Sequence, residues 1–360
     1  MPTTQKNIKV AAIGDLLLTA HPNRGEPDRG LEALSPEIKK IFAESDIVLA
    51  NLECTLPSPD KVSTEPRVFS SIEQIRGLQD AGINLVTMGN NHCFDGGERG
   101  FVELLELLDQ LEIDHFGAGL TISEAAAPTI IEVNGISVAF LAVVDKSSGM
   151  HRFADTETSG VALLDQQRTC RQIRQLSKQV DHIIISPHWG EERFRLPAPN
   201  QIDQARAFIS SGATAVIGHH PHVLQGMDYY EDCPVIYSLS NFFANDVYWE
   251  NGDSLTWNRF ERTGGILLLE MSKEEPINIQ LIPVYDNGET LDIERRGFGE
   301  KYIQRANKLL EGVTDKKYSR ERFRVRALLP IINHLKWAEL KRIRPKHFRK
   351  LLDILFNRNH

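Results

Sequence analysis

Short apolar segments alternate with longer amphipathic segments through about the first 290 residues of the chain. The apolar segments are brief and rich in β-branched residues, which is typical of strands buried in a sheet. Strands are therefore predicted at residues 8–13, 46–50, 84–88, 138–143, 182–186, 215–217 and 235–238. The segments between them carry apolar residues at helical spacing, which predicts helices at residues 31–45, 71–81, 100–111, 165–180 and 200–211.

Residues 264–271 and 276–284 are two further β-prone segments with no helical segment between them. We expect them to form an antiparallel pair added to the sheet. Strands that alternate with helices indicate an α/β fold with helices on the faces of the sheet.

Polar clusters follow nearly every predicted strand directly. The clusters are Gly14-Asp15, Asn51-Leu52-Glu53, Gly89-Asn90-Asn91-His92, Pro187-His188-Trp189-Gly190-Glu191, Gly218-His219-His220-Pro221-His222 and Ser240-Asn241. In α/β folds, ligands bind outside the carboxyl ends of the strands. The six clusters are therefore predicted to face one rim of the fold.

The clusters supply side chains of the kinds that bind divalent metals, namely carboxylates, an amide oxygen and imidazoles. The candidate ligands are Asp15, Glu53, Asn91, His188, His220 and His222. Such a mixed nitrogen and oxygen set suits one or two divalent ions, because a closed structural zinc site needs only four ligands and favours sulfur. Two metals that share a carboxylate can activate a water molecule as hydroxide, so no Ser or Cys nucleophile is needed.

His92 and Asp95 are the candidate catalytic pair. His92 is next to the candidate ligand Asn91, and Asp95 lies three residues further on. A histidine there can protonate a leaving group, and a carboxylate can orient its ring and raise its pKa. Taken singly, Asp15 and Asn91 are also explained as ordinary turn residues. Six strand ends that all carry ligand-type residues favour the metal site.

Composition places the chain among ordinary globular proteins, with 360 residues, 41% of them hydrophobic and 25% charged. Residues 1–7 are polar, and no apolar run approaches the ~18 residues of a membrane-spanning helix. We therefore expect a cytoplasmic protein without a signal peptide. None of the four cysteines forms a C-x-x-C pair, which argues against a zinc knuckle or a disulfide framework.

Charged residues are distributed unevenly along the chain. Residues 301–360 carry 17 Lys and Arg against 5 Asp and Glu, whereas residues 1–300 carry 24 against 44. We predict a main domain at residues 1–297 and a basic helical extension at 298–360. The extension either packs against the acidic domain or makes peripheral contact with an anionic membrane surface. Nucleic acid is not an expected partner, because no aromatic or Gly-rich RNA-binding module accompanies the basic residues.

The ordered motifs resemble those of a known family. They are Gly14-Asp15, Ala50-Asn51-Leu52-Glu53, Gly89-Asn90-Asn91-His92 with Asp95 and Gly97, Pro187-His188-Trp189-Gly190-Glu191, Gly218-His219-His220-Pro221-His222 and Tyr237-Ser238-Leu239-Ser240-Asn241-Phe242. Over about residues 8–285 the chain resembles the CapA family of capsule (poly-γ-glutamate) biosynthesis proteins, which have a calcineurin-like metallophosphatase fold. The resemblance implies a four-layer αββα sandwich, with two mixed sheets between helices and metals at the strand ends.

The resemblance also implies a role for each ligand. Glu53 resembles the carboxylate that bridges two metals, Asn91 and His188 resemble ligands of one metal, and Asp15 resembles a ligand of the other. The Gly-His-x-His element corresponds to His220 and His222, since residues two apart on an extended segment face the same way. His219 is then expected to point elsewhere and to support the ligands from behind.

Three positions depart from the family pattern. At one of them, Glu53 replaces the aspartate that usually bridges the metals. The wider superfamily usually has Asp-x-His at its first motif, whereas Asp15 is followed by two leucines. One of the two metals is therefore expected to bind weakly. Ser240 replaces a family glycine, and if that glycine allows a close backbone approach, the serine narrows it.

We expect a metal-dependent hydrolase, most readily a phosphoesterase, that acts on an anionic small molecule or polymer. The metal is left open among Mn, Fe, Zn and Mg. One alternative is a non-catalytic accessory of poly-γ-glutamate synthesis, and another is a metal-dependent hydrolase of γ-glutamyl amides. Loops at 145–160, with Lys146 and Arg152, and at 242–264, with several aromatic residues, are candidates for substrate contact, although the aromatics could instead close over the core.

Overall fold

The computed structural model describes residues 7–19, 29–60, 62, 65–249 and 251–328, and these divide between two compact units. The first unit, Met1–Val313, contains both sheets and every candidate site residue. Within the second unit, Thr314–His360, the described part consists of α8 (Asp315–Phe323) and a π-helical segment (Arg324–Leu328). The rest of the predicted basic extension, residues 329–360, lies outside the described residues.

The first sheet has the strand order β18-β17-β16-β1-β2-β3-β4, and β13 also pairs with β1. Its strands are β1 (Ile8–Leu17), β2 (Ile47–Leu52), β3 (Leu85–Thr87), β4 (Asp114–Phe116), β13 (Asn241–Ala244), β16 (Thr263–Met271), β17 (Asn278–Asp286) and β18 (Leu291–Ile293). Strands β1 to β4 are parallel, as are β1 and β13, whereas β16 to β18 add an antiparallel edge. The predicted antiparallel pair is confirmed as β16 and β17.

The second sheet has the order β11-β12-β10-β9-β7-β6. Its strands are β6 (Thr129–Val133), β7 (Ile136–Val144), β9 (His182–His188), β10 (Ala215–Ile217), β11 (Met227–Tyr230) and β12 (Cys233–Ile236). The four central strands are parallel, and the two edge strands, β11 and β6, are antiparallel to their neighbours. Both sheets are therefore mixed.

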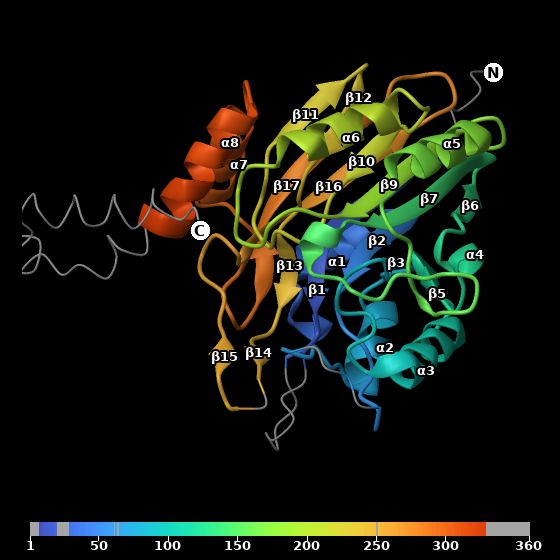
Figure 1. Cartoon of the computed structure of the whole chain (residues 1–360), viewed down its shortest axis with the longest axis vertical. Helices are drawn as coiled ribbons and strands as arrows, with labels where there is room; N and C mark the ends of the chain where they lie inside the picture. Colours follow the sequence, from blue (N-terminus) through green and yellow to red (C-terminus); the bar gives the residue numbers. More distant parts are fainter. Residues whose placement is uncertain (1–6, 20–28, 61, 63–64, 250, 329–360) are drawn as a thin grey trace, which may run out of the picture. The chain divides into compact units, whose positions relative to one another are not determined.

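Alternating side chains on the central strands build three layers of core. Val10 and Ala12 of β1 face Val138 and Phe140 of β7 in the cluster between the two sheets. The neighbouring strand residues point outward, against α1 (Pro36–Ala43), α2 (Ile72–Asp80) and α3 (Gly97–Gln110) on one side and α5 (Gln166–Leu176) and α6 (Pro199–Ile209) on the other. In Figure 1, α5 and α6 lie over β7, β9 and β10. The predicted four-layer αββα sandwich is thus confirmed.

Smaller elements complete the first unit. They are the 3-10 turns η1 (Leu31–Ala33) and η2 (Lys146–Ser148), the helices α4 (Ile122–Ala125) and α7 (Phe298–Leu310), and the two-stranded ladders β5 (Ala118–Gly119) with β8 (Gly160–Val161) and β14 (Val247–Tyr248) with β15 (Ser254–Leu255). The helix predicted from residue 31 begins only at Pro36. Ser35 caps it by accepting a hydrogen bond from the Ile38 N–H, and proline is favourable at a first helical position.

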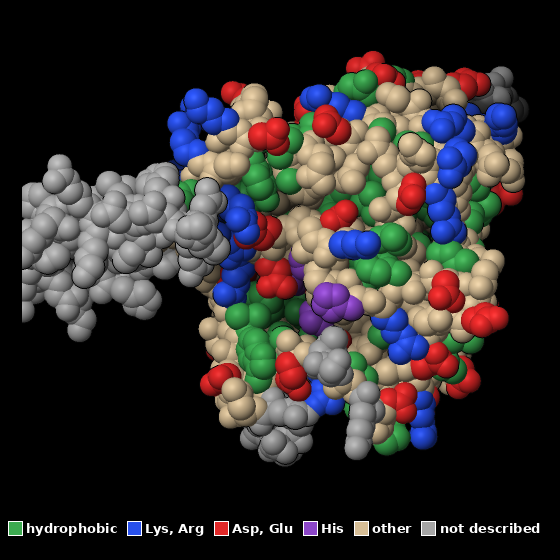
Figure 2. Space-filling model, viewed as in Figure 1, with side chains coloured by type: hydrophobic (Ala, Val, Ile, Leu, Met, Phe, Trp, Pro, Cys, Tyr) green, Lys and Arg blue, Asp and Glu red, His purple; other side chains and the backbone are tan. Residues whose placement is uncertain are grey.

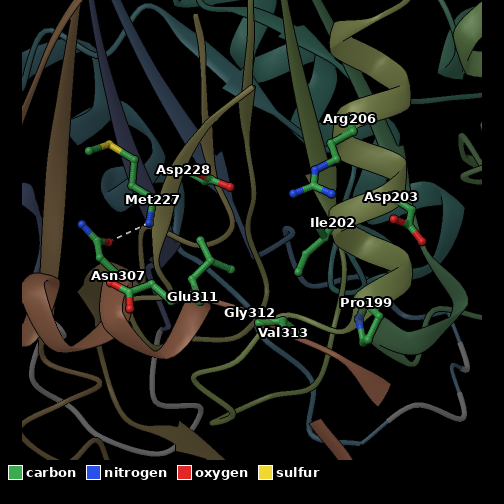
Figure 3. Close-up of a pocket in the computed structure, with 11 residues that line it drawn as sticks. Pro199, Ile202, Asp203, Arg206, Met227, Asp228, Asn307, Glu311, Gly312 and Val313 are labelled. Atoms are coloured by element: carbon green, nitrogen blue, oxygen red, sulfur yellow. Dashed lines mark hydrogen bonds between the residues drawn. The ribbon is translucent and has the colours of Figure 1, made fainter. Parts of the chain in front are cut away.

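The first compact unit ends at Val313, whereas the main domain was predicted to end at residue 297. Helix α7 belongs to this unit because Tyr302 and Ala306 are buried, and because Asn307 Oδ1 accepts the Met227 N–H of β11 at 2.8 Å. A cavity of about 410 Å³ lies between α6, β11 and α7 (Figure 3). It contains none of the candidate site residues. Among the helices of the described residues, none has the length and apolarity needed to cross a membrane.

The core between the sheets is expected to dominate stability. Ile184→Ala removes a fully buried side chain from that layer and should lower the free energy of unfolding by about 2–5 kcal/mol. Ile130→Ala makes the same change at a side chain that is 49% exposed, and it should cost less than about 1 kcal/mol. Urea denaturation of both variants measures the difference, and equal losses would contradict the layer assignment.

Candidate metal centre

The candidate ligands come from strand ends of both sheets. Asp15 lies in β1 and His188 is the last residue of β9. Glu53, Asn91 and residues 218–222, the histidine loop, follow β2, β3 and β10. Strands β1 and β9 therefore run longer than their apolar segments predict, and Asp15 and His188 belong to strands rather than to loops. Asp15 is held there because β13 pairs with the end of β1, where its N–H donates to Ser240 O at 2.9 Å.

Glu53 lies between the two halves of the cluster. Its Oε1 is 3.7 Å from His188 Nδ1, and its Oε2 is 3.7 Å from His222 Nε2. On the side of His222, Asp15 Oδ2 is 3.2 Å from His222 Nδ1. Asp15, Glu53 and His222 each offer one ligand atom, and these atoms lie within 4.8 Å of one another. Glu53 therefore has a different histidine beside each of its two carboxylate oxygens.

The other half of the cluster contains Asn91, His188 and His220. His188 Nε2 is 2.8 Å from Asn91 Oδ1, and the rings of His188 and His220 have centroids 4.8 Å apart. All six predicted ligands therefore meet at one place, although their role in binding metal stays a prediction. Figure 2 shows histidine side chains gathered on one face of the molecule, with acidic side chains beside them.

The histidine loop corrects one geometric expectation. His220 and His222 have φ values of 96° and 54°, so the segment is not extended and the rule for residues two apart does not apply. His219 does not point elsewhere, because its Nδ1 lies 3.3 Å from Asp15 Oδ1 and its side chain is 1% exposed. His219 is consequently a further candidate ligand beside Asp15.

A close backbone approach does occur beside Ser240. The tight contact is at Gly14, where an added Cβ would lie 1.9 Å from Ser240 O. Ser240 has a φ of 65°, and its hydroxyl donates to the carbonyl of His222 at 3.0 Å. The serine therefore ties the histidine loop to β13, and the next residue, Asn241, places its Oδ1 2.8 Å from His222 Nδ1.

Burial and mutual charge set the protonation of the carboxylates. Burial raises the pKa of Glu53 to about 8, and the charge of Asp15 adds to that rise. Burial also acts to raise the pKa of Asp15, but the imidazoles of His219 and His222 outweigh it and hold that pKa well below its usual range. Burial lowers the pKa of His222, but Glu53 and Asp15 outweigh it and raise the value to about 10.

The remaining imidazoles divide into two kinds. Burial lowers the pKa of His220 to about 4, and burial together with the charge of His220 holds the pKa of His188 well below its usual range. Both rings are therefore neutral near pH 7, as metal ligation requires. Burial would lower the pKa of His92 too, but the charge and hydrogen bond of Asp95 outweigh it and raise that pKa. His92 Nδ1 is 2.8 Å from Asp95 Oδ2, so the predicted pair is formed.

Several buried polar atoms at the centre have no hydrogen-bond partner among the described residues. They are Asp15 Oδ2, Glu53 Oε2, both ring nitrogens of His219, and His220 Nδ1. Leaving such atoms unpaired in a protein interior is costly. A divalent cation would satisfy the two carboxylate oxygens and one ring nitrogen of each histidine, and carboxylates with imidazoles are a donor set suited to Mn, Fe or Zn. The residues therefore fit a metal.

Four other residues near the centre were not identified from the sequence as ligands or catalytic residues. Asn51 contacts both carboxylates, and Asn241 contacts His222. Trp257 packs its ring 5.2 Å from that of His222 and is 6% exposed, so this aromatic residue of the 242–264 loop closes over the centre instead of facing solvent. The buried Glu261 fixes this loop by pairing with Arg193 at 2.7 Å. Asn51 and Asn241 both lie in the polar clusters, but their contacts depend on the fold.

Comparison with known proteins assigns the chain to a family. The family model described as bacterial capsule synthesis protein PGA_cap matches residues 9–246. The chain belongs to this family. All eight candidate site residues of the sequence lie within the matched region, whereas Trp257 and Glu261 lie beyond it.

Two curated relatives carry names from capsule and polymer synthesis. The chain is 27% identical over 284 residues to the capsule biosynthesis protein CapA of Bacillus anthracis, covering 76% of this chain and 68% of the relative. It is 28% identical over 251 residues to the PGA biosynthesis protein CapA of Bacillus subtilis, covering 69% and 66%. The chain thus spans about two thirds of the length of these relatives.

Solved structures with a similar arrangement include two enzymes. The NAD nucleotidase NadN of Haemophilus influenzae aligns with a TM-score of 0.46 and 15% identity, covering 89% of this chain and 60% of that one. The sulfate thiohydrolase SoxB of Thermus thermophilus aligns with a TM-score of 0.47 and 13% identity, covering 79% and 57%.

Metal binding should release protons at this centre. Near pH 7, Glu53 with a pKa of about 8 and His222 with a pKa of about 10 both hold a proton, which a metal must displace. Because raising the pH removes these protons, Mn²⁺ should bind more tightly at pH 8 than at pH 6. Isothermal titration calorimetry in two buffers of different ionisation enthalpy measures the released protons. An affinity that is constant between these pH values would contradict this protonation pattern.

Proposed function

We propose that the protein is a metal-dependent hydrolase and that it cleaves phosphoester bonds. The observation that carries this proposal is the position of Glu53, a buried carboxylate with each oxygen toward a different histidine. His92, paired with Asp95, lies next to Asn91 in this cluster. Phosphoester hydrolysis needs both parts, since charge must be stabilised on the phosphoryl oxygens and the leaving group needs a proton.

The metals would be held by two groups of side chains that share Glu53. Asp15, His222 and His219 surround one position, and Asn91, His188 and His220 surround the other. A bound divalent ion supplies a Lewis acid that neutralises developing charge and lowers the pKa of water. Five of the six strand-end side chains are buried and Asn91 is partly exposed, which limits the access of water and strengthens the electrostatic contacts within the cluster.

His92 supplies the proton in this proposal. Because Asp95 raises its pKa, the His92 ring is more fully protonated near neutral pH than a free imidazole. Asp95 is itself held, since its Oδ2 accepts the backbone N–H of Val68 at 2.8 Å. The carboxylate therefore keeps Nδ1 of His92 as the bonded nitrogen and leaves Nε2 as the atom that delivers the proton to a leaving group.

A cavity of about 510 Å³ adjoins the catalytic pair, and we propose that the leaving group occupies it. Asn91 and Asp95 lie in its wall together with Phe94, Glu98 and Arg152. Arg152 is not an open anion receptor, because its guanidinium bonds Glu98 at 2.9 Å and lies 4.7 Å over the ring of Phe94. The wall thus offers an aromatic surface and fixed charges of both signs. The anionic part of the substrate would bind the metals instead of this wall.

A second candidate function is favoured by the relatives, whose names refer to capsule and PGA biosynthesis. In that case the centre grips carboxylates of a poly-γ-glutamate chain without cleaving it. Glutamate oligomers would then bind in a metal-dependent manner and remain intact. Hydrolysis of their γ-glutamyl amide bonds would instead support the amidase alternative.

Loss of His92 should separate catalysis from metal binding. His92→Ala is expected to lower kcat on bis(p-nitrophenyl) phosphate or p-nitrophenyl phosphate by about 10²- to 10⁴-fold, because the proton donor is removed. Metal content, measured by mass spectrometry after loading with Mn²⁺, should stay at the wild-type value. His115→Ala is the matched control, since His115 forms a similar pair with Asp109 at 3.2 Å on the surface and should keep full activity.

Two outcomes would contradict the phosphoesterase proposal. One is metal-loaded wild-type protein that turns over neither ester. The other is a His92→Ala variant with the wild-type kcat. If purified wild-type protein takes up no divalent metal at all, the metal centre itself is wrong.

A further inference from the structure

Asn51 lies at the middle of the carboxylate pair. It occupies the penultimate position of β2, where it is the register partner of Asp15 on β1, and its side chain is fully buried. Its amide nitrogen lies 2.8 Å from Asp15 Oδ1 and 2.8 Å from Glu53 Oε1. The two N–H groups of one amide therefore account for one oxygen of each carboxylate.

Neighbouring backbone groups determine which end of the Asn51 side-chain amide is the oxygen and which is the nitrogen. The backbone N–H of His92 can only donate a hydrogen bond. The side-chain atom of Asn90 that lies 3.0 Å from this nitrogen must therefore be the oxygen. The nitrogen of Asn90 then faces the carbonyl of Leu52 at 2.8 Å and the Asn51 side chain at 3.1 Å. The atom of Asn51 that it meets must accept a hydrogen bond. The oxygen of Asn51 therefore faces Asn90, and its nitrogen faces the carboxylates.

The hydrogen bonds of Asn51 decide which carboxylate oxygens remain. Asp15 Oδ1 and Glu53 Oε1 are used by the amide, whereas Asp15 Oδ2 and Glu53 Oε2 have no hydrogen-bond partner within the described part of the chain. The two remaining oxygens are also those nearest to His222, at 3.2 and 3.7 Å. Without the amide, each carboxyl group could rotate away from this arrangement.

We propose that Asn51 is a positioning residue that holds Asp15 and Glu53 so that Asp15 Oδ2 and Glu53 Oε2 are presented to the divalent cation beside His222. Through Asn90, the same hydrogen-bond chain joins this pair to the backbone of His92. The positions of the cation and of the proton donor are thereby linked by neutral amides, without adding charge to a buried cluster. This inference rests on the proposed metal-dependent function.

The test compares amide loss at the centre with amide loss elsewhere. Asn51→Ala removes both donors, and Asn51→Ser keeps a hydroxyl that can donate to only one carboxylate. Asn84→Ala is the matched control. Asn84 joins two backbone groups of the β2 region, donating to Asp46 O at 3.0 Å and accepting from Val48 N at 2.8 Å, and it bonds no candidate ligand.

Two measurements on the full-length, metal-depleted protein read the result. Calorimetric titration with Mn²⁺ should show binding weakened by about 10- to 100-fold in Asn51→Ala, by less in Asn51→Ser, and not at all in Asn84→Ala. The visible absorption spectrum of the Co²⁺-loaded protein reports the geometry of the ligands. It should shift in both Asn51 variants and stay unchanged in Asn84→Ala. A residue that contributes only to stability would leave this spectrum unchanged.

The outcomes separate the inference from the function on which it rests. Wild-type protein that binds neither Mn²⁺ nor Co²⁺ would overturn the proposed metal-dependent function. Wild-type binding together with wild-type affinity and spectrum in Asn51→Ser would overturn the role of Asn51 alone. Because the serine variant keeps one hydrogen bond, it provides this answer even if Asn51→Ala does not fold.

Discussion

Two carboxylates, Asp15 and Glu53, are buried side by side at the centre of this protein, and the rest of the site depends on that placement. A buried carboxylate is stable only when it is protonated, hydrogen-bonded or paired with positive charge. The chain uses all three means. Burial and the neighbouring charge of Asp15 raise the pKa of Glu53, the Asn51 amide bonds both groups, and His222 contacts both from the opposite side. A divalent cation would satisfy the oxygens that remain.

The four-layer arrangement is what allows so many polar groups to meet. Each central strand keeps its apolar side chains in the cores above and below it, so its carboxyl end can carry a polar residue without weakening those cores. The close contact between Gly14 and β13 then brings Ser240 and Asn241 beside the histidine loop. Stability and site geometry therefore come from different parts of the same strands.

The family match ends at residue 246, but residues beyond it also line the candidate metal centre. Trp257 packs against His222, and Glu261 binds Arg193, whose N–H in turn donates to Pro221 O within the histidine loop. These later residues form one wall of the site and fix the loop that carries the ligands.

The sequence by itself determined the α/β class and the list of eight candidate residues, because alternation of apolar and polar residues reports burial directly. It was less informative where contacts between distant segments decide the structure. The pairing of β13 with β1 moved Asp15 into a strand, and positive φ values in the histidine loop brought His219 toward Asp15. The central position of Asn51 depends on its register with Asp15, 36 residues away. Local pattern carries no information about such distances, so only the tertiary structure decided them.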